Sequence, residues 1–301
     1  MRFSGAGMKI TKPESKKIGA VITDVKIPAL TPGEIDGVKE AVYRFKLVVL
    51  CNNNPSNAEY IEFARLFGTP QIYFQDNYHH PEHPEIFVSS NELYNGKKFG
   101  VSGTGRYWHT DYSFMTEPLS LTMVRPVRIP EGNRGTLYTD MERVWAEMPD
   151  ALRGFVEGRR AIHEAKNRYK VQAKDIDRSL LDIAAEIARE VPAVSHPAVI
   201  HHPVTQGDSL YINEGFTTGI VGMSYEDSRA ALAKLFAFIT EERFIHTHPW
   251  RQGDLLFWDN RTLNHMAAHG AAKDQVSTSF RIGVYDGLPF YTNPDKGSLV
   301  Q

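Results

Sequence analysis

Residues 107–112 read YWHTDY, and residues 258–265, far downstream, read WDNRTLNH. On an extended backbone, residues two apart point to the same side, so His109 and Asp111 present an imidazole and a carboxylate together. His265, delivered from a distant strand, adds a second imidazole and completes a three-ligand face on one metal ion. Two histidines and one carboxylate with open positions opposite them suit non-haem Fe(II) and oxygen chemistry.

The setting of the H-x-D pair matters, because such a pair arises often by chance. Tyr107, Trp108 and Tyr112 surround it with aromatic side chains, and Arg281 lies in the strand expected after His265. Packing of this kind favours a metal site, since ligand geometry must be held by neighbouring side chains.

A rival metal cluster lies at His246 and His248, a second same-side pair with Asp254 nearby. This cluster could bind a metal in a cupin-like way, but it lacks a distant third ligand. The other paired histidines are expected to be hydrogen-bonded structural residues or rim groups: His79, His80, His201 and His202.

The composition is that of an ordinary globular protein. The chain has 301 residues, of which 42% are hydrophobic and 23% charged, so it can bury a sizeable core. A formal net charge of -2 gives no electrostatic reason to expect nucleic acid or a membrane surface as partner. The single cysteine, Cys51, excludes an intramolecular disulfide, and the N-terminus has no apolar signal region. We therefore expect a cytoplasmic protein.

Short strands with helices inserted between them run along the chain. Thr31 as N-cap, Pro32 at the first helical position and Glu34 in a capping box predict a helix over residues 31–45. Further helices are expected over residues 57–68, 148–164, 177–191 and 224–244, the last with Ser224 as N-cap. Strands are expected over residues 18–27, 46–52, 119–129, 136–141, 254–259, 263–269 and 277–287, with two more around the turn at 206–208. This pattern predicts an α+β, mainly β fold, a double-sheet jelly roll forming a single domain over residues 1–301 with helical inserts at about 141–191 and 224–243.

Five motifs occur in a characteristic order. They are WHTD (108–111), RGTLYTD (134–140), SLYINEGFTTGIVG (209–222), GDLLFWDNRTLNH (253–265) and SFRI (279–282). Together they resemble the taurine dioxygenase family of Fe(II)/2-oxoglutarate oxygenases, and the resemblance runs from about Ile18 to Tyr285. It implies a double-stranded β-helix, an Fe(II) cofactor, 2-oxoglutarate as co-substrate and O2.

The resemblance implies a role for each matched residue. His109, Asp111 and His265 correspond to the catalytic iron ligands, and Thr136 and Arg281 correspond to the residues that hold the distal carboxylate of 2-oxoglutarate. The chemistry fits, because a buried carboxylate needs a charge-assisted partner, which an arginine supplies. The segment between His265 and Arg281 is longer than in taurine dioxygenase, and Tyr285 stands where that enzyme carries an arginine for the sulfonate. A sulfonate substrate is therefore disfavoured.

A closer similarity is to the branch of this family that makes isonitriles from N-carboxymethyl-β-amino acids. It rests on the stretch YFQDNYHHPEHPEIFVSS (73–90) and on a lysine in the helical insert. The similarity implies that Tyr73, Tyr78 and Lys170 bind the substrate. Phe74 departs from related sequences, which carry a second tyrosine at this position. The loss of this hydroxyl leaves the exact substrate chain open but does not change the expected reaction type.

The residues alone support these substrate assignments less strongly. A dianionic substrate in a near-neutral protein requires cations and hydroxyl donors that converge on the metal. Lys170 fits that need, yet it also fits a solvated helix, and Tyr73 and Tyr78 also fit a hydrophobic core. Arg134, in the turn before Thr136, is a secondary candidate for carboxylate contact, with a surface turn residue as the alternative.

The sequence thus predicts a dioxygenase of secondary metabolism that acts in isonitrile biosynthesis. Its expected reaction converts an N-carboxymethyl-β-amino acid, such as 3-[(carboxymethyl)amino]butanoate, to an isonitrile acid. Two alternatives stay open: hydroxylation of another small carboxylate, and a non-catalytic jelly-roll protein that binds metal. The expected partner is a small, dianionic molecule, with no nucleic acid and no membrane, and a homo-oligomer is left open.

Overall fold

The computed structural model describes residues 7–14, 17–132, 135–170, 175–268, 275–293 and 298–299. The chain divides into two compact units. Unit 1 comprises Met1–Arg106, Leu119–Tyr138 and His246–Leu288, and unit 2 comprises Tyr107–Pro118, Thr139–Ile245 and Pro289–Gln301. The single domain expected over residues 1–301 stays a prediction.

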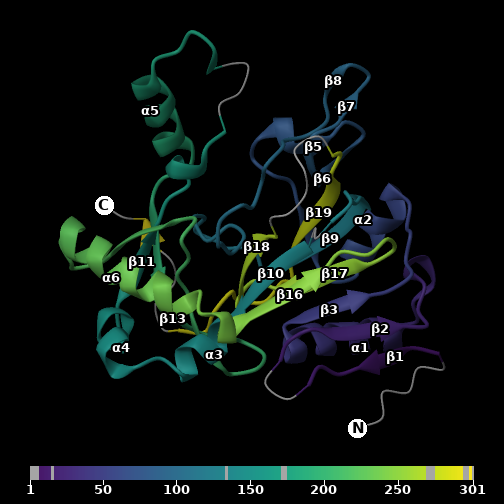
Figure 1. The fold of residues 1–301 in the computed structure, drawn as a ribbon, viewed down its shortest axis with the longest axis horizontal. Coiled ribbons are helices and arrows are strands. Elements are labelled where there is room, and N and C mark those ends of the chain that lie inside the picture. The colour runs from purple at the N-terminus through teal and green to yellow at the C-terminus, as the bar shows by residue number, and fades with distance from the viewer. Residues whose placement is uncertain are drawn as a thin grey trace. The chain divides into compact units, whose positions relative to one another are not determined.

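Unit 1 is built on a nine-stranded sheet (Figure 1). Its strand order is β1 (Lys9–Thr11), β2 (Ala20–Thr23), β3 (Leu47–Leu50), β17 (Leu255–Asp259), β9 (Leu121–Arg128), β19 (Thr278–Tyr285), β6 (His83–Ser90) and β5 (His79–His80), and β4 (Thr69–Gln71) pairs with β19. A second sheet has the order β16 (Ile245–Pro249), β10 (Gly135–Asp140) and β18 (Leu263–Ala267). Smaller elements of this unit are η1 (Ile27–Ala29), η2 (Asp76–Tyr78) and the hairpin of β7 (Leu93–Tyr94) with β8 (Lys97–Lys98).

The strand β17 lies at the centre of unit 1, and every one of its residues is buried. It pairs antiparallel with β3 on one side and with β9 on the other. Because side chains alternate along a strand, Leu255 and Phe257 join one hydrophobic cluster, whereas Leu256 and Trp258 join another. The second cluster also contains Leu263 of β18, so the two sheets of unit 1 share this core, as a jelly roll requires.

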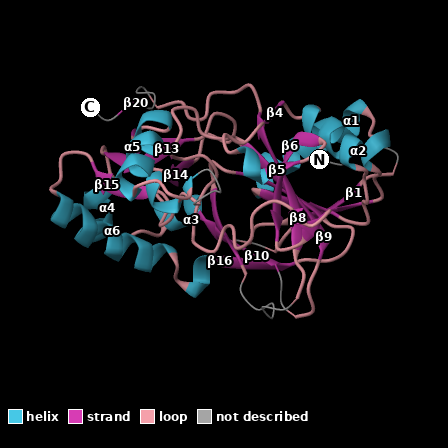
Figure 2. Ribbon diagram, turned by 90° about the horizontal axis from the view of Figure 1, so that it is seen from above, coloured by secondary structure: helices cyan, strands magenta, loops and turns pink. Residues whose placement is uncertain are grey.

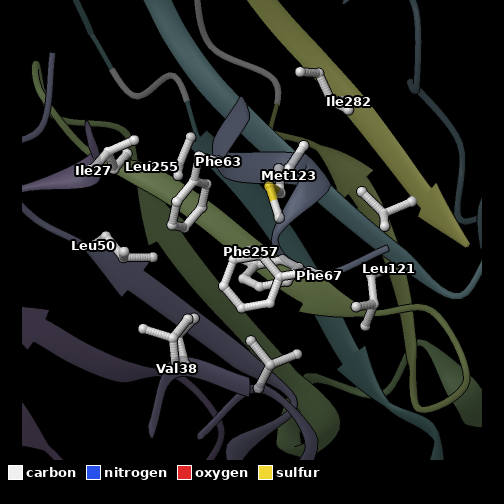
Figure 3. Packing of buried hydrophobic residues seen from close by; sticks show 14 of the residues in the cluster. Ile27, Val38, Leu50, Phe63, Phe67, Leu121, Met123, Leu255, Phe257 and Ile282 are labelled. Atoms are coloured by element: carbon white, nitrogen blue, oxygen red, sulfur yellow. The ribbon is translucent and has the colours of Figure 1, made fainter. Parts of the chain in front are cut away.

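Two helices cover the first cluster, α1 (Pro32–Phe45) and α2 (Asn57–Arg65). The capping box of Thr31 and Glu34 begins α1 as the sequence predicts, with Pro32 in the first turn. From α2 and the residues after it, Phe63 and Phe67 reach the sheet, and their ring centroids lie 6.5 and 4.9 Å from that of Phe257 (Figure 3). The helices thus bury the apolar face that the sheet would otherwise expose.

A buried ion pair holds the turn between β17 and β18. The guanidinium of Arg261, 1% exposed, donates to both carboxylate oxygens of Asp286, at 2.9 and 3.0 Å. The hydroxyl of Tyr43 donates to the same carboxylate at 2.8 Å, and the carboxylate of Asp259 lies 3.6 Å from the guanidinium. Burial alone would raise the pKa of Asp286, but these hydrogen bonds hold its pKa below the usual value.

Unit 2 combines a small sheet with most of the remaining helices. The sheet order is β15 (Thr217–Ile220), β11 (Arg160–His163), β12 (Val194–Pro197) and β20 (Ser298–Leu299), and β13 (Val199–His201) pairs with β14 (Asp208–Leu210). The helical elements are α3 (Met141–Ala146), α4 (Asp150–Val156), η3 (Lys166–Arg168), α5 (Leu180–Glu190), α6 (Tyr225–Ile239) and η5 (Glu242–Phe244). Figure 2 shows α4 and α6 side by side, and both contribute to one hydrophobic cluster with α3.

The helix expected over residues 148–164 is wrong in its second half. It ends at Val156, Gly158 adopts a left-handed φ of 67°, and Arg160–His163 form the strand β11. Pairing with β12 and β15 on both sides outweighs the helical spacing of this segment. The N-cap expected at Ser224 is confirmed, since its side chain accepts from the backbone N–H of Asp227.

None of the helices in the described part of the chain has the length and apolar character needed to cross a lipid bilayer.

The substitution Arg261→Leu should lower the free energy of unfolding by about 3–5 kcal/mol, because it leaves the carboxylate of Asp286 buried without its cation. Urea denaturation measures this loss. The matched control is Arg65→Leu at the surface, where Arg65 pairs with Glu62 and Glu85, and its expected cost is below about 1 kcal/mol. Equal losses of unfolding free energy in the two variants would contradict the stabilising role of the buried ion pair between Arg261 and Asp286.

Two buried histidines should make the protein less stable in acid. Burial lowers the pKa of both His163 and His196, to about 4 for His196. Because these folded-state values lie below the unfolded value of about 6.5, the stabilisation is complete above about pH 6.5 and is lost as the pH falls towards about 4.

His196→Gln tests this pH dependence, because glutamine can keep the hydrogen bond that His196 Nε2 donates to the carbonyl of Met115. The free energy of unfolding, measured from about pH 8 to about pH 5, should decline less steeply than in the wild type. The control His201→Gln removes a histidine whose pKa is raised by its hydrogen bond to Asp208, so the decline should stay at least as steep. A wild-type slope in the His196→Gln variant would show that His196 does not titrate on unfolding.

Candidate metal centre

Ligand atoms from His109, Asp111 and His265 converge, and all three side chains are buried. One atom from each residue lies within 4.8 Å of the other two. Among the described residues, this is the single group of three or more His, Cys, Asp or Glu side chains that meets such a distance. The set expected from the sequence is therefore brought together.

The distance between His109 and Asp111 fits a shared ion. His109 Nε2 lies 3.9 Å from Asp111 Oδ1, which is too long for a hydrogen bond. Imidazole nitrogens and carboxylate oxygens bind an ion such as zinc at roughly 2.0–2.2 Å, so two such atoms 3.9 Å apart can both reach it. The donor set of two imidazoles and one carboxylate suits Fe(II).

The ring of His109 is oriented by a backbone atom. His109 Nδ1 lies 2.9 Å from the carbonyl oxygen of Tyr107, to which it donates as an N–H. This hydrogen bond fixes the tautomer in which Nε2 carries the lone pair and can bind a metal ion.

The backbone at the ligand pair differs from the expected strand. Residues 111–114 form a turn that begins two residues after His109, and Tyr112 has a left-handed φ of 60°. The proximity of His109 and Asp111 therefore comes from a turn after an extended residue, and not from strand alternation alone. The buried ring of Tyr112, stacked on Phe114 at 5.5 Å, accompanies this unusual conformation.

Gly215 supports the ligand segment in a way that the sequence reasoning missed. A Cβ atom at this position would lie 2.7 Å from the ring of Tyr107 and 3.1 Å from Cβ of His109. The N–H of Gly215 donates to the carbonyl of Trp108 at 2.9 Å, and Asn213 Nδ2 donates to Ser113 Oγ at 3.0 Å. The motif NEGF was visible in the sequence as part of the family pattern, but its contact with the ligand segment was not.

His265 lies on β18, where aromatic side chains hold its ring. The ring centroid lies 4.8 Å from that of Trp258 and 6.4 Å from that of Tyr138. Both aromatic residues belong to the core shared by the two sheets of unit 1. The ring of His265 is thus held by packing and by the buried turn at Arg261.

The two residues expected to hold 2-oxoglutarate are both in unit 1. On β19, the guanidinium of Arg281 lies over the ring of Phe87, 4.0 Å from its centroid. On β10, Thr136 Oγ1 accepts a hydrogen bond of 3.0 Å from Trp250 Nε1. Because the indole N–H only donates, the hydroxyl of Thr136 keeps its own proton for a carboxylate. Trp250 was not anticipated from the sequence.

The two expected substrate tyrosines form a cluster with Arg281. The ring centroids of Tyr73 and Tyr78 lie 4.8 Å apart and stand 5.0 and 4.5 Å from that of Phe87. The guanidinium of Arg281 lies 5.8 Å from the ring centroid of Tyr73. Phe87 comes from β6, a strand that was not expected because proline and histidines surround its short alternation of buried residues.

The other substrate candidates belong to different segments. Lys170 follows η3 in unit 2 and is half-buried. Arg134 lies outside the described residues, so its expected contact with a carboxylate stays a prediction.

The rival cluster around His248 does not form a comparable group in the described chain. His248 Nε2 lies 3.3 Å from Asp254 Oδ2, and burial lowers the pKa of His246 to about 4. The paired histidines expected to be structural are indeed hydrogen-bonded. Their partners include the carbonyl of Tyr73 for His79, Asn57 for His80, Asp208 for His201 and the backbone N–H of Val204 for His202.

Known proteins of similar sequence include named dioxygenases. The chain is 28% identical to pentalenolactone F synthase of Streptomyces arenae over 261 residues, which cover 84% of this chain and 87% of the relative. It is 27% identical to the alpha-ketoglutarate-dependent sulfate ester dioxygenase of Pseudomonas putida, over 85% of this chain and 82% of the relative.

Solved structures agree with the expected fold. A taurine dioxygenase from Burkholderia xenovorans superposes with a TM-score of 0.78 at 25% identity, over 98% of this chain and 95% of that chain. The enzyme AAD-2, solved in complex with Mn(II) and N-oxalylglycine, has a TM-score of 0.77 at 20% identity, over 94% of this chain and all of its own length. The mainly β jelly-roll fold expected from the sequence is confirmed.

A match to the family described as taurine catabolism dioxygenase TauD, TfdA extends over residues 10–276, which is most of the chain. The buried group of two histidines and an aspartate agrees with the Fe(II), 2-oxoglutarate and O2 that this family uses. The chain therefore belongs to the TauD, TfdA family and is a non-haem Fe(II)- and 2-oxoglutarate-dependent dioxygenase.

Proposed function

We propose that this dioxygenase converts an N-carboxymethyl-β-amino acid, such as 3-[(carboxymethyl)amino]butanoate, to an isonitrile acid. The observation that carries the proposal is the cluster of Tyr73 and Tyr78 beside the guanidinium of Arg281. The two rings lie beside the residue expected to hold 2-oxoglutarate, so their hydroxyl groups can serve as donors to a substrate bound next to that co-substrate. The resemblance of residues 73–90 to the isonitrile-forming branch points to the same substrate class.

In this proposal His109, Asp111 and His265 hold the iron, and Arg281 and Thr136 hold the distal carboxylate of 2-oxoglutarate. When bound, Fe(II) and 2-oxoglutarate together use O2 to remove hydrogen from the substrate. Arg281 neutralises the carboxylate through charge-assisted hydrogen bonds, while the Trp250 indole directs the hydroxyl of Thr136. The His109 tautomer is already set before any ligand arrives, because its acceptor is the Tyr107 carbonyl.

The substrate residues orient the glycyl methylene for attack. Lys170 would pair its ammonium group with one substrate carboxylate, and the hydroxyls of Tyr73 and Tyr78 would donate to the substrate. Such positioning is the main contribution of the protein, since the cofactors supply the oxidising power.

The overall reaction is a four-electron oxidation with loss of one carboxylate. The group R–NH–CH2–COOH gives R–N≡C and CO2, and it releases four hydrogens, which leave as two waters. Two O2 molecules are the electron acceptors. They take four electrons from the substrate and four from two 2-oxoglutarates, which become two succinates and two further CO2. Two succinates for each product therefore distinguish this reaction from a simple hydroxylation, which forms one.

Phe74 adapts the cluster to a different substrate chain. Its ring packs against that of Tyr73 at 4.6 Å and is 38% exposed. A phenyl ring here supplies apolar surface where related sequences supply a hydroxyl, so an apolar substrate chain is favoured over a polar one. The remaining alternative of a non-catalytic metal-binding protein is set aside by the family membership.

Arg281→Gln should raise the concentration of 2-oxoglutarate needed for half-maximal turnover by about one to two decades, because a hydrogen bond to a charged group contributes roughly 1.5–3 kcal/mol. Succinate formation at varied 2-oxoglutarate measures the effect. Arg125→Gln is the matched control, since Arg125 also stacks on aromatic rings, at 5.2 Å from Phe280, and lies on the neighbouring strand β9. A normal 2-oxoglutarate requirement in Arg281→Gln would remove Arg281 from the cofactor site.

Lys170→Ala should abolish product while sparing the uncoupled conversion of 2-oxoglutarate to succinate, because the iron and cofactor residues are unchanged. Mass spectrometry of products from N-carboxymethyl-3-aminobutanoate and its homologues, with succinate counted in parallel, measures both. Lys166→Ala is the control on the same segment, where Lys166 is exposed and pairs with Glu164.

The wild-type enzyme should form two succinates and release one substrate carboxylate for each isonitrile. One succinate for each stable hydroxylated product would favour the hydroxylase alternative. Unchanged product formation by Lys170→Ala would show that Lys170 is a solvated lysine with no part in binding.

A further inference from the structure

Arg168, the last residue of η3, contacts the segment that carries His109 and Asp111. Its guanidinium carbon lies 3.9 Å from the ring centroid of Tyr107. The same guanidinium donates from Nε to the carbonyl of Gly215 at 3.1 Å. One side chain thus joins the ring of Tyr107 to the backbone at Gly215.

These contacts continue to the iron ligand. The carbonyl of Tyr107 accepts the hydrogen bond from His109 Nδ1, and the Tyr107 ring centroid lies 5.1 Å from that of His109. The absence of a side chain at Gly215 lets its backbone approach both residues. A change in the place of the Tyr107 ring would therefore move the acceptor that orients His109.

The segment after Arg168 carries the proposed substrate lysine. Lys170 is two residues further on, and the intervening Tyr169 donates its hydroxyl to Asp175 Oδ2 at 2.9 Å. The ion pair of Arg178 with Asp175, at 3.2 Å, adds to this anchor. The segment is thus attached at Tyr169 to the start of the α5 region and at Arg168 to the metal-ligand segment.

We propose that Arg168 is a positioning residue that fixes the Lys170 segment against the His109 segment. The inference rests on the proposed roles of His109 and Lys170. Only a planar guanidinium can stack flat on a ring and donate in its own plane at once, so lysine should replace it in part. Loss of Arg168 frees the Tyr107 ring, loosens the orientation of His109 and releases Lys170 from its fixed place.

The first measurement is Fe(II) affinity without turnover. Under anaerobic conditions with saturating 2-oxoglutarate, Fe(II) is titrated while the metal-to-ligand charge-transfer absorption is followed. Arg168→Ala should raise the dissociation constant of Fe(II) by roughly tenfold or more, as is typical when a residue that orients a ligand is removed. Arg168→Lys should give an intermediate value, and this variant keeps the test open if alanine impairs folding.

Arg153→Ala is the matched control for a purely structural effect. Arg153 stacks on Trp145 at 4.1 Å and donates from Nε to the carbonyl of Met148 at 3.0 Å, so its contacts are of the same kind. It should lower the melting temperature about as much as Arg168→Ala and leave Fe(II) affinity unchanged. An equal effect of both variants on Fe(II) affinity, or no effect of either, would overturn the proposal.

The second measurement is the amount of product formed for each succinate. Arg168→Ala should lower this ratio, because Lys170 loses its anchor, whereas Arg153→Ala should keep the wild-type ratio. A wild-type ratio in Arg168→Ala would overturn the link to Lys170. His109→Ala serves as a reference for the metal site. If this variant retained Fe(II) affinity, the assignment of His109 as a metal ligand would fail. If His109→Ala lost Fe(II) affinity and Arg168→Ala kept it, only the inference about Arg168 would fail.

Discussion

The ion pair of Arg261 with Asp286 is the interaction on which the rest of unit 1 depends. It fills the turn between β17 and β18 with a cation and an anion that water does not reach, and hydrogen bonds satisfy both. Isolated charges there would be very costly, so the turn has one stable arrangement. That arrangement brings together the rings of Trp258 and His265, which come from consecutive strands in the two different sheets. The place of the second histidine is therefore a consequence of buried electrostatics as much as of strand pairing.

The parts of the fold that could be predicted from the sequence are those with local causes. The capping box at Thr31 and the apolar run of β17 depend on neighbouring residues, and both are confirmed. The strand β11 could not be predicted, because its pairing with β12 and β15 overrides a local helical pattern. The strand β6 was missed for a similar reason, since its partner β19 lies almost two hundred residues away in the chain.

In the candidate site, too, some features could be predicted from the sequence and others could not. The identities of His109, Asp111 and His265 followed from residue types and family motifs, and their ligand atoms do converge. The residues that orient the site could not be read from the sequence, because they act through contacts between distant segments. Trp250 directs Thr136, and Gly215 admits the Tyr107 ring, yet neither residue carries a chemical group that marks it as functional. Only their distances reveal what they do.

The backbone acceptor at Tyr107 has a consequence for how such an enzyme can change over generations. Every amino acid carries the same carbonyl group, so no exchange at this position deletes the atom that sets the His109 tautomer. Substitutions at position 107 therefore leave the acceptor of the His109 hydrogen bond in place. Side chains proposed to face the substrate, such as Phe74, can then vary without the loss of that hydrogen bond. Single substitutions can then change substrate specificity while the tautomer of His109 stays the same.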